Sequence, residues 1–280
     1  MIDIKSRLDT INSLLSEGTK KSLTYAALEC RLTIELICYE RLKISYDYIS
    51  HADLKKWQPR NVIEQVAEEA NEDVASTFTI SISTTPATEG SEPKTQEDYE
   101  ALSYVPIGTQ AGFNIRKLGK LWNALSNVAL HVSLPEQKND QISIYGDIDS
   151  TKSKVIEVIE ELKKFKDGNL ITSGFGKEYS FECNTCGTTL KRKLNLLKNG
   201  QVINCISPSC QESYNIYIQG DQAFHSRRVF ETPCNECNSN VQIPQRQVEK
   251  LRFGQSPLLL DCESCKTPLH IELVPCKKNT

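Results

Sequence analysis

Apolar residues recur every three to four positions through most of the first 165 residues. This spacing predicts a helix over residues 2–16 and a longer helix that Ser22 caps and that runs to about Tyr46. The centre of the longer segment, YAALECRLTIELICY, is apolar nearly all round. A helix of this kind is usually buried in the middle of a bundle.

The same spacing predicts three more helices. They cover residues 59–70, residues 113–132 and residues 151–165. Ser150 or Thr151 is the expected cap of the last one. Residues 77–83 alternate between apolar and polar and predict a strand. Residues 84–97 are rich in Thr, Pro, Glu, Gly and Ser, and they predict an exposed loop.

After Gly174 the pattern changes to short strand-like runs separated by turns and by pairs of cysteines. The runs are residues 179–181, 202–203, 214–218, 258–260 and 269–273. The sequence also repeats, because FECNTC…NCISPSC…YNIYI in the first copy corresponds to ETPCNEC…DCESC…LHIEL in the second. Two copies of one small module explain this repeat better than one larger fold does.

The predicted fold class is therefore α+β. We expect an N-terminal α-helical bundle over residues 1–168, with an insertion near residues 73–110. Two small β-rich modules should follow, at residues 175–220 and 221–280. A chain of 280 residues is long enough for two or three domains.

Charge and composition exclude several classes of function. The chain has 33 Lys+Arg against 36 Asp+Glu; residues 1–168 carry 20 against 26 and the remainder 13 against 10, so charge alone does not indicate a nucleic-acid-binding protein. No apolar run approaches the ~20 residues that span a bilayer, and no signal-peptide pattern is visible. We therefore expect a cytoplasmic protein with no membrane partner. The phosphate-binding motifs G-x-x-x-x-G-K-[ST] and G-x-G-x-x-G are absent, which disfavours ATP-driven work and hydride transfer.

Nine of the eleven cysteines follow residue 182, and eight of them form four closely spaced pairs. The pairs are Cys183 and Cys186, Cys205 and Cys210, Cys234 and Cys237, and Cys262 and Cys265. Disulfides are rare in the cytosol, whereas two such pairs can bind one ion tetrahedrally. The spacing thus predicts two structural zinc ions per chain, with Cys276 left over and His270 as a less favoured ligand. The alternatives are unrelated buried cysteines or a redox Cys-x-x-Cys pair.

Residues 176–275 resemble the zinc-ribbon class, whose members commonly bind nucleic acid or protein. Cations alternate here with aromatic residues such as Tyr214 and Tyr217, and this combination can hold phosphates and stack on bases. The candidate nucleic-acid-binding residues are Lys191, Arg192, Lys193, Arg227 and Arg228. A partner protein and an ordinary solvated surface are the alternatives.

A polar stripe lies opposite the apolar face of the predicted helix over residues 113–132. It consists of Arg116, Lys120, Asn123, Asn127 and His131. Asn127 and His131 are four residues apart, so on a helix both can contact one ligand or each other. A solvated surface is the other interpretation of the stripe.

The predicted long helix carries Glu29, Arg31 and Glu35, and a later helix ends in SNVALH. Together they resemble the HEPN superfamily of helical bundles, over about residues 20–165. This superfamily includes ribonuclease toxins, nucleotide-binding partners and antiviral effectors, and its signature is an Arg, then usually a polar residue such as Asn, then a His about one turn on. The resemblance implies a homodimer through the helical domain. It also implies a metal-independent site, usually built from two subunits, that cuts RNA by attack of the 2′-hydroxyl.

Asn127 and His131 match this signature, but Ser126 stands where the Arg would be. The reaction needs a group that titrates near neutral pH, which His131 can supply, and a cation that stabilises the phosphate. Arg31 is the candidate cation, so the candidate catalytic residues are His131, Asn127 and Arg31. Alternatively, Arg31 belongs to an internal ion network with the two glutamates of its own helix.

Two functions remain as hypotheses. The first is a HEPN-like protein that engages RNA or other nucleic acid, as a metal-independent ribonuclease in prokaryotic antiviral defence or as a toxin. The second is a non-catalytic dimeric adaptor whose zinc ribbons bind nucleic acid or a partner protein. Ser126 favours the second hypothesis, and His131 supports the first. A transcription regulator has only the ribbons in its favour, because no helix-turn-helix pattern is apparent.

Overall fold

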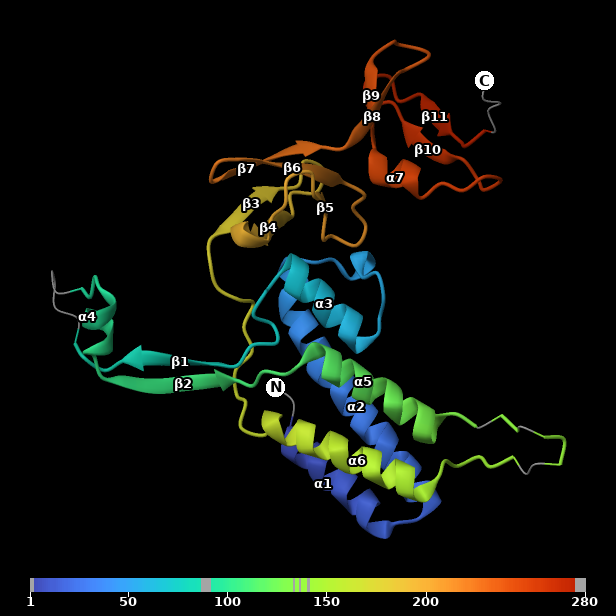
Figure 1. The fold of residues 1–280 in the computed structure, drawn as a ribbon. Helices are drawn as coiled ribbons and strands as arrows, with labels where there is room; N and C mark the ends of the chain where they lie inside the picture. Colours follow the sequence, from blue (N-terminus) through green and yellow to red (C-terminus); the bar gives the residue numbers. More distant parts are fainter. Residues whose placement is uncertain (1–2, 87–91, 133, 136, 140–141, 275–280) are drawn as a thin grey trace. The chain divides into compact units, whose positions relative to one another are not determined.

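The computed structural model describes residues 3–86, 92–132, 134–135, 137–139 and 142–274. Over these residues an N-terminal α-helical region precedes small antiparallel sheets, which is an α+β layout (Figure 1). The chain divides into two compact units. Unit 1 comprises Met1–Ser45 and Leu54–Phe175, and unit 2 comprises Tyr46–Asp53 and Gly176–Thr280. None of the helices in the described part is both long enough and apolar enough to cross a membrane.

Unit 1 is a bundle in which one long helix contacts all the other bundle helices. The helices are α1 (Ile4–Glu17), α2 (Lys20–Ile44), α3 (Pro59–Glu69), α5 (Ile115–Leu125) and α6 (Ile148–Leu162). The central helix is α2, which packs against α1, α3, α5 and α6. Apolar residues at helical spacing on each helix are removed from water by this packing, which is the main source of stability for a bundle.

The helices lie where the hydrophobic spacing predicts them, but two of their caps are different from those expected. Thr19 rather than Ser22 caps α2, and Ser22 completes a capping box as the third helical residue. Asp147 caps α6 and accepts the Ser150 N–H at 2.8 Å, so the expectation of Ser150 or Thr151 as cap is wrong. Several residues with side-chain oxygens lie at each helix start, and spacing alone does not show which of them is the cap.

An antiparallel hairpin of β1 (Phe78–Ser83) and β2 (Tyr104–Gln110) extends from the bundle, with the short helix α4 (Gln96–Glu100) between its strands (Figure 1). The sequence pattern predicts β1 but neither β2 nor α4. Pro106 and Gly108 are residue types that strands disfavour, and the pairing is irregular beside them. Residues 87–91 of the expected loop lie outside the described residues.

Arg41 of α2 anchors the base of this hairpin. Its side chain is buried and donates hydrogen bonds to the carbonyl oxygens of Val74, before β1, and Ala111, after β2. The guanidinium carbon lies 4.7 Å from the centre of the Phe113 ring. Burial lowers the pKa of Arg41 to about 10, so the group is still charged at neutral pH and remains a strong donor to both carbonyls.

The helix α5 ends in a π-helical turn, Ser126–Leu130, and does not continue as the predicted α-helix. His131 then has an extended backbone, with φ −123° and ψ 138°. The Val128 carbonyl of the turn accepts the Thr151 hydroxyl at 3.1 Å. Gly146 lies so close that a Cβ there would be 1.8 Å from the same oxygen. A distant segment therefore contributes to the end of this helix, which the local sequence pattern does not reveal.

Unit 2 contains two β-rich modules with a common plan. The first has β3 (Glu178–Glu182), β4 (Thr189–Lys193), β5 (Val202–Asn204), β6 (Ser213–Gln219) and β7 (Gln222–Arg227), and the second has β8 (Val229–Pro233), β9 (Asn240–Pro244), α7 (Gln245–Glu249), β10 (Leu258–Asp261) and β11 (Pro268–Ile271). The pair β3–β4 corresponds to β8–β9, and β5–β6 corresponds to β10–β11, while β7 extends only the first module. A cysteine pair lies between the two strands of every one of these pairs, in agreement with the internal repeat.

The segment Tyr46–Asp53, which follows α2 in the sequence, belongs to unit 2. The buried Tyr48 donates its hydroxyl to the Glu178 carboxylate at 2.5 Å, and Arg246 donates to Asp53 at 2.8 Å. These partners are 130 and 193 positions apart in the chain. No local pattern in the sequence predicts such contacts.

Candidate functional site

The eight paired cysteines of unit 2 gather into two groups of four. The first group is Cys183, Cys186, Cys205 and Cys210, and the second is Cys234, Cys237, Cys262 and Cys265. The four sulfur atoms of each group lie within 4.8 Å of one another. The closest Sγ–Sγ distances are 3.5 to 3.7 Å, near the ~3.8 Å edge of a tetrahedron with metal–sulfur bonds of about 2.3 Å. Each group could therefore hold one metal ion.

These sulfurs are not cross-linked, and the two cysteine pairs of each group interleave. All the cysteines in the described part are free, and a disulfide would require sulfur atoms about 2.05 Å apart. Cys183 lies against Cys210, and Cys186 lies against Cys205. Both turns therefore close around the same point. A metal ion bound at that point by all four sulfur atoms would have a complete tetrahedral shell and no position for a substrate.

Three of the four cysteine turns share one backbone geometry. The residue after the second cysteine is left-handed in each: Gly187 (φ 70°), Asn238 (φ 57°) and Lys266 (φ 61°). The next residue places a hydroxyl 3.0 to 3.2 Å from the second sulfur, and these residues are Thr188, Ser239 and Thr267. The pattern C-x-x-C-x-[ST] occurs three times in the sequence and could have identified these hydroxyls. Cysteine spacing alone does not.

Hydrogen bonds lower the pKa of three of the eight cysteine thiols, which are Cys186, Cys237 and Cys262. The Thr188 hydroxyl, and then the Thr188 N–H, lower the pKa of Cys186 to about 6. The Ser239 hydroxyl, and then N–H groups of its own turn, lower the pKa of Cys262 to about 6. Burial raises the pKa of Cys205 instead. Because the thiolate is the form that binds a metal, these donors stabilise the metal-binding state.

The aromatic surface of the first module differs from the one expected. Tyr214 is fully buried, donates its hydroxyl to the Cys183 sulfur at 3.3 Å and accepts the Asn184 N–H at 2.8 Å. The expectation that Tyr214 is available to stack on bases is therefore wrong. Tyr217 and Phe224 are both exposed, and they lie directly opposite each other on β6 and β7.

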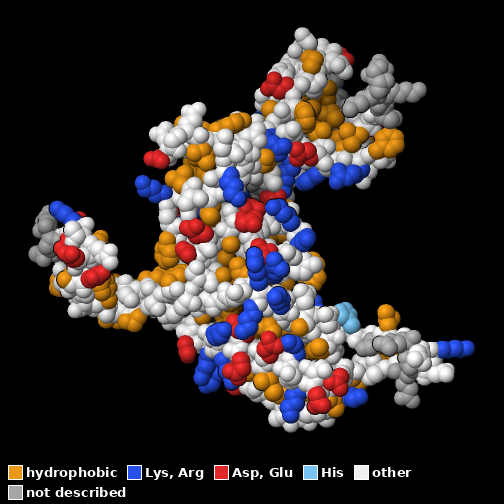
Figure 2. Space-filling model, in the orientation of Figure 1, with side chains coloured by type: hydrophobic (Ala, Val, Ile, Leu, Met, Phe, Trp, Pro, Cys, Tyr) orange, Lys and Arg blue, Asp and Glu red, His pale blue; other side chains and the backbone are white. Residues whose placement is uncertain are grey.

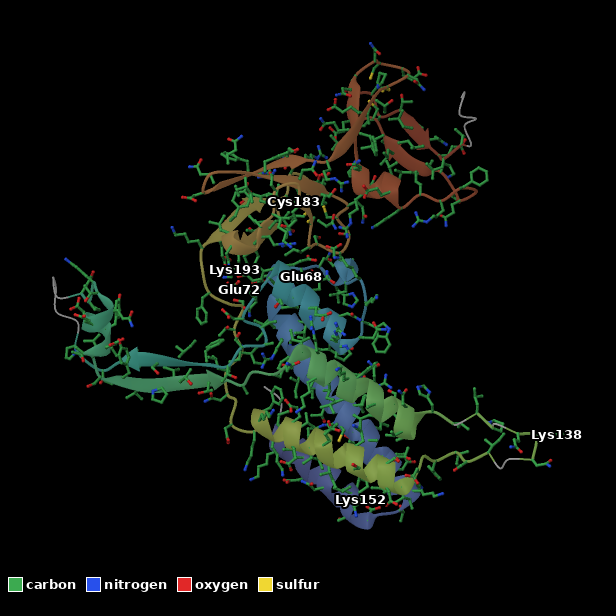
Figure 3. The ribbon with its side chains drawn as sticks, viewed as in Figure 1. Glu68, Glu72, Lys138, Lys152, Cys183 and Lys193 are labelled. Atoms are coloured by element: carbon green, nitrogen blue, oxygen red, sulfur yellow. The ribbon has the colours of Figure 1, made fainter. Side chains whose placement is uncertain are left out.

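The cations expected to bind nucleic acid all make contacts inside unit 2. Four of them are paired with carboxylates: Lys191 with Asp47 (3.2 Å), Lys193 with Glu178 (2.6 Å), Arg227 with Glu212 (2.6 Å) and Arg228 with Glu249 (2.8 Å). Arg192 is buried. Figure 3 labels Lys193 on the same module as Cys183 of the first sulfur group. At four of these five side chains a phosphate would compete with a carboxylate that is already paired with the cation.

In unit 1, Arg31 of α2 lies against the π-helical turn. Its Nη1 donates to the Ser126 hydroxyl at 2.7 Å, so the candidate cation contacts the residue that replaces the signature Arg. Its Nε donates to Glu35 at 3.3 Å, and the same Glu35 oxygen accepts the Trp122 Nε1–H at 2.8 Å. The guanidinium carbon also lies 3.9 Å from the centre of the Trp122 ring. These four residues form one network.

Asn127 and His131 are exposed and do not join this network. The predicted i, i+4 relation between them is not present, because a π-turn intervenes and His131 is extended. Within the described residues, no hydrogen bond links either side chain to Arg31. The structure thus brings together Arg31 and the Ser126 position, but it does not bring His131 to them.

Acidic and basic side chains are mixed on the face of unit 1 that Figure 2 shows. Blue Lys and Arg side chains lie beside red Asp and Glu side chains over α3, α5 and α6 (Figure 2). A phosphate backbone is attracted by a patch or stripe of positive charge. The charge pattern on this face gives no separate support for RNA binding.

Comparison with known proteins does not assign the chain to a family. No family model, no curated protein and no solved structure matches it. Its function is therefore inferred from the two sulfur groups and from the network around Arg31.

Proposed function

We propose that each sulfur group holds one zinc ion and that the two modules are zinc ribbons. Four sulfur donors at tetrahedral spacing form the ligand set that structural zinc prefers. The second module supports the proposal most strongly, because in its described part the buried cluster consists of just four residues, Cys234, Val241, Ile243 and Cys262. Bound zinc would supply folding free energy to such a module and would take no part in a reaction.

We further propose that the protein is a non-catalytic, HEPN-like adaptor whose ribbons bind a partner protein. The observation that carries this is the engagement of Arg31 by Glu35 and Trp122, which offsets its charge and fixes its position. Because cations of unit 2 such as Lys191 and Arg227 are already paired with carboxylates, a partner other than nucleic acid is favoured. The exposed aromatic pair Tyr217 and Phe224 fits a protein interface, in which such side chains are enriched.

An RNA assay tests this function. Purified wild-type protein, with no added divalent metal, should cleave single-stranded and structured RNA no faster than the His131→Ala variant. Any RNA binding that the wild type shows should be unchanged in Lys191→Ala and Arg228→Ala. Metal-free cleavage that disappears in His131→Ala would overturn the non-catalytic assignment.

A metal-independent ribonuclease, acting in antiviral defence or as a toxin, is the second candidate. It is favoured by the 2.7 Å contact between Arg31 and Ser126, since a cation from another helix reaches the position of the signature Arg. In that case His131 would transfer the proton and Arg31 would exchange Glu35 for the phosphate. Glu35→Gln should then increase cleavage and Arg31→Ala should abolish it. Neither variant should matter for an adaptor assayed on RNA.

A further inference from the structure

One face of α2 is apolar and exposed, although the helix contacts four others. Four large side chains on this face are 36 to 48% exposed: Tyr25, Leu28, Leu32 and Leu36. Tyr39, which is partly exposed, continues the stripe. We call these five residues the α2 seam. The expectation that this helix is buried all round is wrong along the seam, and a continuous apolar stripe of this kind marks a contact surface.

The seam is symmetric in sequence about Leu32. Leucines lie four residues before and after it, at Leu28 and Leu36, and tyrosines lie seven residues before and after it, at Tyr25 and Tyr39. In a two-fold dimer the same surface is used by both copies, so the surface must be complementary to itself. Two antiparallel copies of α2 with the axis at Leu32 would pair each leucine with a leucine and each tyrosine with a tyrosine.

The charges beside the seam favour a second copy over a charged partner. Glu29 on one side is paired with Arg7 at 2.7 Å, and Glu35 on the other side is paired with Arg31 at 3.3 Å. Beside the middle of the seam the charge is therefore close to neutral, and a strongly basic or acidic helix would find no complementary charge at these two pairs. Two copies brought together would bury no uncompensated charge at these pairs.

The apolar surface extends beyond the seam at one end. Trp57 is 59% exposed, and its carbonyl accepts the Tyr39 hydroxyl at 2.7 Å. From Tyr25 to Tyr39 the seam is about 21 Å long at 1.5 Å per residue. That length gives four turns of each helix for contact with the other.

We propose that the α2 seam binds the same seam of a second copy, antiparallel and with the two-fold axis at Leu32. The dimer named here goes beyond the proposed adaptor function, because it specifies the surface and the residue on the axis. In an antiparallel pair related by a two-fold axis, the same edge of α2 in both copies faces the same side of the dimer. Since Arg31 is next to Leu32, the two Arg31–Ser126 contacts would lie near each other on one edge.

Sedimentation of the full-length, metal-loaded protein tests the surface. Wild type should be a dimer, and Leu32→Glu should raise the dissociation constant by roughly tenfold or more, because a charge would be buried at the axis. The circular dichroism of the variant should be unchanged. Ile156→Glu on α6, an equally drastic change at a side chain that is 43% exposed outside the seam, should remain dimeric. A monomeric wild type, or a dimer that Leu32→Glu does not weaken, would overturn the proposal.

Cross-linking tests the symmetry. Under oxidation, Leu32→Cys should form a dimer linked through residue 32 alone, identified by mass spectrometry of the linked peptide. Leu28→Cys should not link to itself but should link to Leu36→Cys when the two variants are mixed. A link between two copies of residue 28 would indicate parallel helices and contradict the proposed axis. These results do not depend on whether the protein cleaves RNA, so they fail or succeed separately from the proposed function.

Discussion

The two units obtain their stability from different sources. Unit 1 buries apolar side chains of five helices against one another, with α2 at the centre. Unit 2 has two small buried clusters, of eight and four residues, and cysteines make up three of the eight and two of the four. A small module with so few buried apolar groups usually needs a metal or disulfides to fold. Metal removal should therefore unfold unit 2 and leave unit 1 folded. Substitutions in the helical core should lower the stability of unit 1 without affecting the sulfur groups.

The largest expected effect is the loss of unit 2 on chelation. Removing zinc should cost the modules on the order of 10 kcal/mol, because metal binding and folding are coupled. Limited proteolysis followed by mass spectrometry should then cut within residues 46–53 and 176–274 and leave residues 3–45 and 54–86 protected. Cys262→Ser should expose the second module in the same way, while Cys276→Ser, which changes the cysteine outside the described residues, should not. Equal digestion of both units after chelation would contradict the comparison.

The next largest effect is expected at the base of the hairpin in unit 1. Arg41→Met would leave the buried carbonyl of Val74 and the partly buried carbonyl of Ala111 without their donor, which should lower the free energy of unfolding by about 2–4 kcal/mol. Chemical denaturation followed by circular dichroism measures this loss. Lys163→Met, which removes an exposed ion pair with Glu160, is the matched control and should change stability by less than about 0.5 kcal/mol.

A smaller loss is expected for Gly146→Ala. The new Cβ would lie 1.8 Å from the Val128 carbonyl oxygen, so the segment before α6 must shift and the Thr151 bond to that oxygen should weaken. We expect destabilisation of about 1–3 kcal/mol. Gly18→Ala is a useful comparison, because nothing lies within 4 Å of a Cβ there and only its positive φ opposes the change. An unchanged melting temperature for Gly146→Ala would show that the turn is not fixed by this contact.

Acid should affect unit 1 through Glu161, which is buried on α6. Burial alone would raise its pKa, but the ammonium groups of Lys117 and Lys164, at 2.5 and 2.8 Å, lower it below the ordinary value. Because the folded pKa is the lower one, this group stabilises the fold above the unfolded pKa of about 4.3. That stabilisation is lost as the pH falls through the folded pKa. Glu161→Gln should therefore show a weaker decline of the melting temperature between neutral pH and pH 3 than wild type does.

The smallest effect compares the cysteine turns of the two modules. Lys266 adopts the left-handed conformation that Gly187 adopts in the first module. Lys266→Gly should relieve about 1 kcal/mol of backbone strain, offset in part by the greater freedom of glycine in the unfolded chain. The stability of the second module should therefore rise slightly. Slower hydrogen exchange of its backbone amides in Lys266→Gly than in wild type would measure this rise. Gly187→Ala should instead lower the stability of the first module.

The parts that could be predicted from sequence are those that short-range patterns encode. The helices follow from residues three and four apart, and the gathering of eight sulfur atoms into two groups of four follows from cysteines three or five residues apart within each pair. The sequence pattern does not predict the strand β2, because Pro106 and Gly108 obscure its alternation. The bond between Arg31 and Ser126 joins residues 95 positions apart. The resemblance to the HEPN superfamily indicates Arg31 as the candidate cation, but the sequence does not show its contact with Ser126.

The pairing of the expected nucleic-acid-binding cations with carboxylates also joins residues far apart in the chain, so the sequence pattern does not predict it. Lys191 pairs with Asp47, which lies far before it in the sequence. Arg228 pairs with Glu249 of α7, a helix that the sequence pattern does not predict. The end of α5 depends on Gly146 and Thr151, which follow it by about 20 residues. A pattern within one segment carries no information about contacts of this kind.

Elemental analysis of the full-length protein, purified without chelator, tests the central claim most directly. Two zinc ions per chain are expected for wild type, one for Cys186→Ser or Cys262→Ser, and none for the double variant. A wild-type chain with less than one zinc, or with iron in its place, would contradict the account of unit 2.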